Sequence, residues 1–335
     1  MPIITQDLRP DKVRKFAMHK KLCGPVAALL DLINEHGRAM RMRECANRLL
    51  VRRCEGCGEM HITGGNLCRD RLCPVCQWRL SIRRYANMVS AMNYLHDSQK
   101  LDGYQVGMLT LTVKNCAPAD LSKTISEMMV GFKRWQQRRT IRDQIVGFAR
   151  SLEITYNRSK GTFHPHIHLM IIWQPSGKSG KLSAQMAKEW ASACRLDYKP
   201  IYQYEDAYAK KETSSSSGSE WEAVLSAVKE CSKYVCKAAD FIALADLESN
   251  TPSMPLTHFR ALVDAVRNRR LVSYAGIIAD ARKALLIPED DEDESAAEDT
   301  ISCPKCGCGM GESLLEWSGV GADAKYIPAA ATYTL

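Results

Sequence analysis

The sequence predicts an α+β protein: an antiparallel sheet with flanking helices, preceded by an N-terminal zinc-binding module. Two observations carry this prediction. Apolar, β-branched runs and amphipathic segments follow one another in the order strand, helix, strand, strand, helix, strand between residues 101 and 204. Upstream lie two CxxC pairs, Cys54/Cys57 and Cys73/Cys76, with the spacing of a zinc module. The apolar content of 45% is ordinary for a globular protein.

The chain of 335 residues is longer than one typical domain. We expect a basic helical region with the cysteine module over 1–100, the sheet domain with further helices over 101–285, an acidic linker over 286–300 and a small cysteine-containing tail over 301–335. The N-terminus carries charges where a signal peptide needs an apolar core, and no apolar run approaches the roughly 18 residues that span a bilayer. We therefore expect an intracellular, cytoplasmic protein.

The charge is distributed unevenly along the chain. Glu289–Glu294 forms an acidic block that Glu298 and Asp299 extend, and without these eight residues the formal charge of +8 would be +16. So high a positive charge on the rest of the chain favours a polyanionic partner, and nucleic acid is the first candidate. A basic surface that is merely solvated is the alternative.

The chain has fourteen cysteines, and the CxxC pairs among them indicate zinc in a reducing compartment rather than disulfides. Fifteen residues separate Cys57 from Cys73, within the usual window for two pairs that complete one tetrahedral site. The candidate ligands are four of the five cysteines Cys54, Cys57, Cys68, Cys73 and Cys76. His61 is a surplus candidate, and a redox CxxC is the alternative.

Arginines surround this module, and a further group of cysteines lies in the tail. Flanking arginines suit contact with a phosphate backbone, and a solvated face is again the alternative; they are Arg69, Arg71, Arg79, Arg83 and Arg84. The tail holds Cys303, Cys306 and Cys308. Three cysteines are too few for a closed zinc site, so they would borrow a ligand, pair across a dimer or stay free.

A histidine strand is the second candidate site. His166 and His168 alternate within an apolar run, so they point to the same face of a strand. Residues 145–156 read as the preceding strand and 157–162 as a turn, which predicts a hairpin with Glu153 opposite the region of His166. A carboxylate and two imidazoles would then converge. Two hydrogen-bonded structural histidines are the alternative, and Pro165 leaves the placement of His164 open.

A third candidate lies on a helix that a Ser-x-x-Glu capping box starts at Ser219. Glu230, Tyr234 and Lys237 are spaced i, i+4, i+7, so a continuous helix projects them to one side. The alternative is a surface tyrosine between ordinary charges.

Together these motifs resemble a known family. Leu109–Thr112, His164–His168 and Glu230–Lys237, in this order and downstream of the cysteine region, resemble the replication initiator (Rep) proteins of rolling-circle plasmids, within the HUH endonuclease superfamily. The resemblance covers roughly residues 45–285, and the quoted motifs do not place the cysteine tail after Ile301 within the family pattern.

The resemblance implies an HUH (ferredoxin-like or RRM-like) sheet and metal-dependent, site-specific nicking and rejoining of single-stranded DNA at a plasmid origin. His166 and His168 would hold Mn²⁺ or Mg²⁺, with Glu153 as the candidate third ligand because hard cations prefer oxygen. The Tyr234 hydroxyl would attack the scissile phosphate, giving a 5′-phosphotyrosyl enzyme and a free 3′-OH that primes synthesis.

The same resemblance assigns two charged residues beside the nucleophile. Lys237 would favour the phenolate or steady charge on the phosphate. Glu230 would activate water for a second cleavage at termination. A second tyrosine as nucleophile is the alternative, and its candidates are Tyr198, Tyr202, Tyr204 and Tyr208.

The implied partners are origin DNA, as a single-stranded nick site with adjacent duplex, and a separate host helicase and polymerase. Gly177-Lys178-Ser179 lacks the glycine that a phosphate-binding loop requires at Ile172, so no NTPase motif is present. A homodimer stays open, and no membrane association is expected. The alternative functions are an HUH transposase or relaxase, or a non-catalytic zinc-dependent DNA-binding regulator.

Overall fold

The computed structural model describes residues 11–174, 179–206, 220–232, 254–288, 302–303, 305–319 and 321–329. The chain divides into two compact units. The described residues of the first unit lie within Met1–Arg79 and Asp291–Leu335, and those of the second lie within Leu80–Phe241 and Ser253–Asp290. The first unit is therefore assembled from both ends of the chain, and the second is inserted between them.

This division differs from the expected one, in which the tail over 301–335 stood apart from the N-terminal region. Strand β8 (Met310–Ser318) pairs antiparallel with β1 (Arg48–Cys54) along the whole of β1, from Arg48 opposite Glu316 to Cys54 opposite Met310. Backbone hydrogen bonds thus join the tail to the N-terminal region. The acidic composition of residues 286–300 predicted a linker, but it did not predict that the tail after it pairs with β1.

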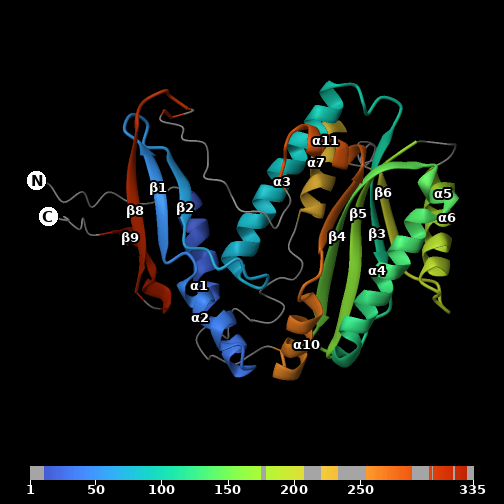
Figure 1. Cartoon of the computed structure of the whole chain (residues 1–335), viewed down its shortest axis with the longest axis horizontal. Helices are drawn as coiled ribbons and strands as arrows, with labels where there is room; N and C mark the ends of the chain where they lie inside the picture. Colours follow the sequence, from blue (N-terminus) through green and yellow to red (C-terminus); the bar gives the residue numbers. More distant parts are fainter. Residues whose placement is uncertain are drawn as a thin grey trace, which may run out of the picture. The chain divides into compact units, whose positions relative to one another are not determined.

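The first unit combines helices with a four-stranded antiparallel sheet in the order β2-β1-β8-β9 (Figure 1). Its other elements are α1 (Asp11–Leu32), α2 (His36–Glu44), β2 (Met60–Gly65), the 3-10 turn η3 (Gly321–Asp323) and β9 (Lys325–Pro328). Within the basic helical region expected over 1–100, α2 ends at Glu44 and Arg48–Cys54 forms a strand whose apolar residues Leu49 and Val51 are buried.

The second unit holds a five-stranded antiparallel sheet in the order β6-β3-β5-β4-β7. Its elements are α3 (Pro74–Asp97, which begins in the first unit), β3 (Gln105–Thr112), η1 (Pro118–Asp120), α4 (Leu121–Gln137), α5 (Arg139–Arg142), β4 (Ile145–Asn157), β5 (Thr162–Trp173), α6 (Ser179–Ala193), β6 (Tyr202–Asp206), α7 (Glu220–Cys231), α10 (Leu256–Val266), β7 (Val272–Gly276) and α11 (Ile277–Ala284). The predicted α+β class and the predicted order of elements from β3 to β6 are confirmed. None of the helices in the described part of the chain is long and apolar enough to cross a membrane.

Helices cover both faces of this sheet (Figure 1). On one face, Met108, Ala149, Met170 and Ile172 pack in a single core cluster with buried residues of α3, α7 and α11. On the other face, α4 turns a buried stripe to the sheet, and Phe132 of this stripe meets Phe148 of β4 edge to face at 5.5 Å. The central strand β5 is therefore apolar on both faces after His168, which accounts for the continuous run Leu169–Trp173.

Candidate functional site

Glu153, His166 and His168 form one cluster on the β4–β5 hairpin. The register pairs Glu153 with His166, and His168 follows on the same face of β5. Glu153 Oε2 lies 2.9 Å from His168 Nε2 and 3.5 Å from His166 Nε2. One ligand atom from each residue lies within 4.8 Å of the others. The structure therefore brings together the three residues that the sequence predicted to converge.

The second ring nitrogen of each histidine has a partner that orients the imidazole. His166 Nδ1 is 3.2 Å from the carbonyl oxygen of His164. Because a carbonyl only accepts hydrogen bonds, Nδ1 of His166 carries a proton, and Nε2 is the ring nitrogen that faces Glu153. His168 Nδ1 lies 3.3 Å from Thr110 Oγ1 on β3. Such outer contacts are the usual way in which proteins orient metal-binding histidines.

Glu153 and His166 are buried, and His168 is half-buried. Burial opposes ionisation of Glu153, but hydrogen bonds from His166 and His168 outweigh it and hold the pKa of this carboxyl group well below its usual range. The cluster thus offers one carboxylate oxygen and two imidazole nitrogens, a donor set that fits a single divalent cation and leaves coordination positions for a substrate.

His164 belongs to the edge of this site rather than to the cluster. Its Nδ1 lies 2.9 Å from Asn115 Oδ1, and its ring stacks on that of His166 at 5.4 Å between centroids. Burial, followed by the charge of His166, lowers the pKa of His164. Thr110 lies in the segment Leu109–Thr112 that carries the family resemblance, but the sequence did not predict its contact with His168, and Asn115 gave no signal at all. Both contacts depend on the approach of β3 and the residues after it to β5, which is far away along the chain.

Helix α7 lies on the same face of the sheet as the cluster. Cys231, at its end, places Sγ 3.7 Å from Met108 Sδ and 3.6 Å from the carbonyl oxygen of Ala149. Glu230 is half-buried on this helix. α7 ends at Cys231, earlier than the long helix expected from the sequence, and Tyr234 and Lys237 lie outside the described residues.

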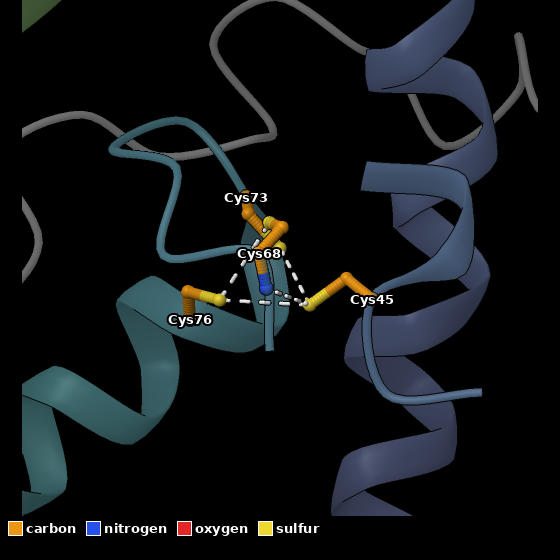
Figure 2. Close-up of side chains that lie close together, drawn as sticks. All are labelled: Cys45, Cys68, Cys73 and Cys76. Atoms are coloured by element: carbon orange, nitrogen blue, oxygen red, sulfur yellow. Dashed lines mark hydrogen bonds between the residues drawn. The ribbon is translucent and has the colours of Figure 1, made fainter. Parts of the chain in front are cut away.

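A second cluster gathers four cysteines in the first unit (Figure 2). Its members are Cys45, Cys68, Cys73 and Cys76. Cys45 follows α2, Cys76 lies on the first turn of α3, and the other two belong to the loop between β2 and α3. The Sγ atoms of Cys45 and Cys76 are 3.5 Å apart, and those of Cys68 and Cys76 are 3.8 Å apart. Four sulfurs around zinc, each about 2.3 Å from it, are separated by about 3.8 Å, so the set fits tetrahedral Zn²⁺.

Buried and half-buried polar groups stabilise this cluster. The Lys20 ammonium donates hydrogen bonds to the carbonyl oxygens of Arg43 and Cys45, at 2.6 and 2.7 Å. Arg38 grips Asp70 through two hydrogen bonds of 2.7 and 3.0 Å, and Asp70 also accepts from the backbone N–H of Leu72. Asp70 thereby fixes the loop between Cys68 and Cys73.

This arrangement corrects the predicted grouping, in which Cys54 and Cys57 shared one site with Cys73 and Cys76. The structure joins Cys68, Cys73 and Cys76 but supplies Cys45 as their fourth partner, and it brings Cys54 and Cys57 into a different cluster with Cys303 and Cys306. His61 lies on β2 and belongs to neither group. The spacing rule for zinc sites considers only CxxC pairs that are close in the sequence. It therefore did not identify Cys45, a single cysteine at the end of a helix, as a ligand.

Comparison with known proteins identifies the family of this chain. A family model described as "Replication protein" matches residues 59–324. The chain is 31% identical over 276 residues to "Protein rep" of Bacillus amyloliquefaciens, covering 78% of this chain and 79% of that one. A "Protein rep" of Bacillus sp is 30% identical over 262 residues, covering 76% and 83%, and one of Lentilactobacillus hilgardii is 27% identical over 259 residues, covering 76% and 77%. No solved structure matches significantly. The chain therefore belongs to the family of replication (Rep) proteins that initiate rolling-circle replication of plasmids.

Proposed function

We propose that the second unit is an HUH endonuclease domain that nicks and rejoins single-stranded DNA at the plasmid origin through a 5′-phosphotyrosyl intermediate. The observation that carries this proposal is the cluster of Glu153, His166 and His168, with mutual distances that suit one cation. Membership of the replication protein family favours this function over a transposase or a relaxase, which would share the chemistry.

Glu153, His166 and His168 would hold Mn²⁺ or Mg²⁺. A carboxylate suits either ion, while two imidazoles are better matched to Mn²⁺ than to Mg²⁺, which prefers oxygen ligands. The bound ion would supply Lewis acidity and orient the phosphoryl oxygens. The chain's own contribution is to keep the Nε2 lone pairs and the Glu153 carboxylate facing one point, through the contacts of Nδ1 described above.

Tyr234 would be the nucleophile. In the nicking step the Tyr234 hydroxyl loses its proton as its oxygen forms a bond to the phosphorus, the bond from phosphorus to the 3′ oxygen breaks, and the released 3′ oxygen takes up a proton. Rejoining is the reverse, with a 3′-OH attacking the phosphotyrosine. Tyr234 follows Cys231 by three residues, and the contacts of Cys231 with Met108 and Ala149 set the end of α7 on the sheet face that carries the histidines, which supports this assignment.

Lys237 would stabilise the Tyr234 phenolate or the charge on the phosphate, and Glu230 would activate water at termination. Two of the tyrosines that could serve as a second nucleophile, Tyr198 and Tyr204, already accept hydrogen bonds from other groups. This supports the assignment of the termination step to Glu230 rather than to a second tyrosine. Tyr198 accepts a hydrogen bond of 2.8 Å from the backbone N–H of Lys114, and burial raises the pKa of its phenol. Tyr204 accepts from the Trp173 indole at 2.9 Å. Tyr202 lies on β6, and Tyr208 is outside the described residues.

The first unit would bind origin DNA through its basic surface, with Cys45, Cys68, Cys73 and Cys76 holding a structural Zn²⁺. Because the sequence has no phosphate-binding loop, strand separation would depend on a host helicase, and synthesis on a host polymerase in the cytoplasm. A homodimer could bind the origin in the same way, through the first unit of each copy.

A covalent-adduct assay tests the proposal. The protein is incubated with a labelled single-stranded origin oligonucleotide and Mn²⁺, and SDS-stable complexes are separated by electrophoresis. We expect an adduct that EDTA suppresses, that Tyr234→Phe abolishes and that the matched control Tyr198→Phe retains. An adduct that persists in Tyr234→Phe would refute the nucleophile. No adduct from wild-type protein that still binds origin duplex would identify a non-catalytic regulator.

A further inference from the structure

The tail of the chain completes a second four-cysteine cluster, formed with the N-terminal hairpin. Its members are Cys54, Cys57, Cys303 and Cys306, and their Sγ atoms all lie within 4.8 Å of one another. Sγ of Cys54 is 3.3 Å from that of Cys306, and Sγ of Cys57 is 3.6 Å from that of Cys303. These separations are near the ~3.8 Å between sulfurs on one tetrahedral zinc and well above the ~2.0 Å of a disulfide.

The two halves of this cluster share one local design. Each is a Cys-x-x-Cys-Gly sequence, and the closing glycines Gly58 and Gly307 have φ of 70° and 73°, a left-handed conformation that favours glycine. In each half the glycine N–H donates to the carbonyl oxygen of the first cysteine, from Gly58 to Cys54 at 3.1 Å and from Gly307 to Cys303 at 2.8 Å. In the first half, the Cys57 N–H also points to Cys54 Sγ at 3.4 Å. Two turns of the same form thus aim two sulfurs each at one point.

The sheet beneath the cluster holds the two turns together. β1 and β8 pair up to Cys54 opposite Met310, and the Glu55 N–H continues the ladder to the Gly309 carbonyl oxygen at 3.1 Å. Gly56 packs so closely against the tail that a Cβ there would lie 2.6 Å from Cys308 Sγ. The two CxxC turns therefore pack directly against each other, although about 250 residues separate them along the chain.

We propose that Cys54, Cys57, Cys303 and Cys306 bind a second structural Zn²⁺, which closes a zinc ribbon split between the two ends of the chain. Neither half has enough ligands for a closed site, and together they make a tetrathiolate site of the structural type. The metal joins β1 to a segment that follows the second unit along the chain. This unit is then completed only after the whole endonuclease domain has been made.

The two zinc sites differ in their exposure. Cys57 and Cys306 are exposed, while Cys45 and Cys73 of the first cluster are buried. A chelator therefore reaches the split site first, and zinc release from the wild-type protein has two phases of equal size, the faster from this site. This inference does not depend on the nicking chemistry, because it concerns metal content alone.

Zinc content of the full chain, purified under reducing conditions and measured by plasma mass spectrometry, tests the assignment. We expect two zinc ions per chain in the wild type and in the control Cys308→Ser. Cys54→Ser/Cys57→Ser and Cys303→Ser/Cys306→Ser should each retain one and lose the fast phase, and the variant with all four changes should also retain one. Cys73→Ser/Cys76→Ser should retain one and keep the fast phase.

One zinc in the wild type, two in either double variant of the split site, or none in the fourfold variant would overturn the proposal. Should the serine variants aggregate, two further measurements decide the question. Cys306→His preserves a fourth ligand and should keep two zinc ions. The cadmium-substituted wild type should give two ¹¹³Cd resonances of the tetrathiolate type, and a single one would refute the second site.

Discussion

Glu153 stands directly opposite His166 in the register of β4 and β5, and its Oε2 atom is shared between the Nε2 atoms of His166 and His168. A hairpin register is enough to build this site, because all three side chains leave the same face of adjacent strands. The remaining requirement is orientation, which Thr110 and the His164 carbonyl provide. This division between ligands and orienting groups leads to separate predictions.

Glu153→Gln should weaken cation binding without unfolding the sheet. The amide retains the shape of the side chain but lacks the negative charge that a divalent cation requires. We expect the Mn²⁺ concentration for half-maximal adduct formation to rise at least about tenfold. The matched control Glu189→Gln removes a carboxylate that pairs with Arg138 on the other face of the sheet, and it should leave this concentration unchanged. Equal Mn²⁺ dependence in the two variants would remove Glu153 from the ligand set.

Thr110→Val should act through His168. It keeps the volume of the side chain but removes the hydroxyl 3.3 Å from His168 Nδ1. Loss of an outer contact of this kind lowers metal affinity by about 10- to 100-fold. Isothermal titration with Mn²⁺ measures the change, and Thr110→Ser, which keeps the hydroxyl, should restore affinity close to wild type. If serine and valine behave alike, Thr110 contributes only to packing.

Lys20→Met should destabilise the first unit. The substitution leaves the carbonyl oxygens of Arg43 and Cys45 without the buried ammonium that bonds both. An unsatisfied buried polar group costs about 1–3 kcal/mol, so we expect a lower midpoint of thermal unfolding for this unit. Lys15→Met, at an exposed position of the same helix, is the control and should leave the midpoint within error. An unchanged midpoint in Lys20→Met would show that water replaces the ammonium.

The Cys231 thiol should resist alkylation in the folded protein. Burial raises the pKa of this thiol to about 12, so it stays protonated at every pH well below that value, while an ordinary thiol with a pKa of 9.0 ionises earlier. At pH 9 we expect iodoacetamide to modify exposed Cys308 and to spare Cys231 until denaturant is added. Peptide mass spectrometry reports both sites. Labelling of Cys231 at the rate of Cys308 would mean that α7 does not cover this face of the sheet.

The sequence by itself determined the features that depend on neighbouring residues. Apolar periodicity marked β3, α4, β4 and β5, and the short turn between residues 157 and 162 was enough to place Glu153 opposite His166, because a hairpin loop of given length allows few registers. The same local information predicted that the CxxC turns bind metal. It did not locate the end of α7, since helix ends depend on tertiary contacts as well as on periodicity.

Only the tertiary structure decided which cysteines belong together. Any two CxxC turns can complete a tetrahedral site, so spacing alone paired Cys54/Cys57 with Cys73/Cys76. The chain instead pairs β1 with β8, which carries the tail to Cys54 and Cys57, and leaves Cys45 to complete the other cluster. Strand pairing between distant segments depends on the whole buried sheet, and no local pattern encodes it. For that reason the first unit, with both of its cysteine clusters, could be recognised only after the two ends of the chain were seen side by side in one sheet.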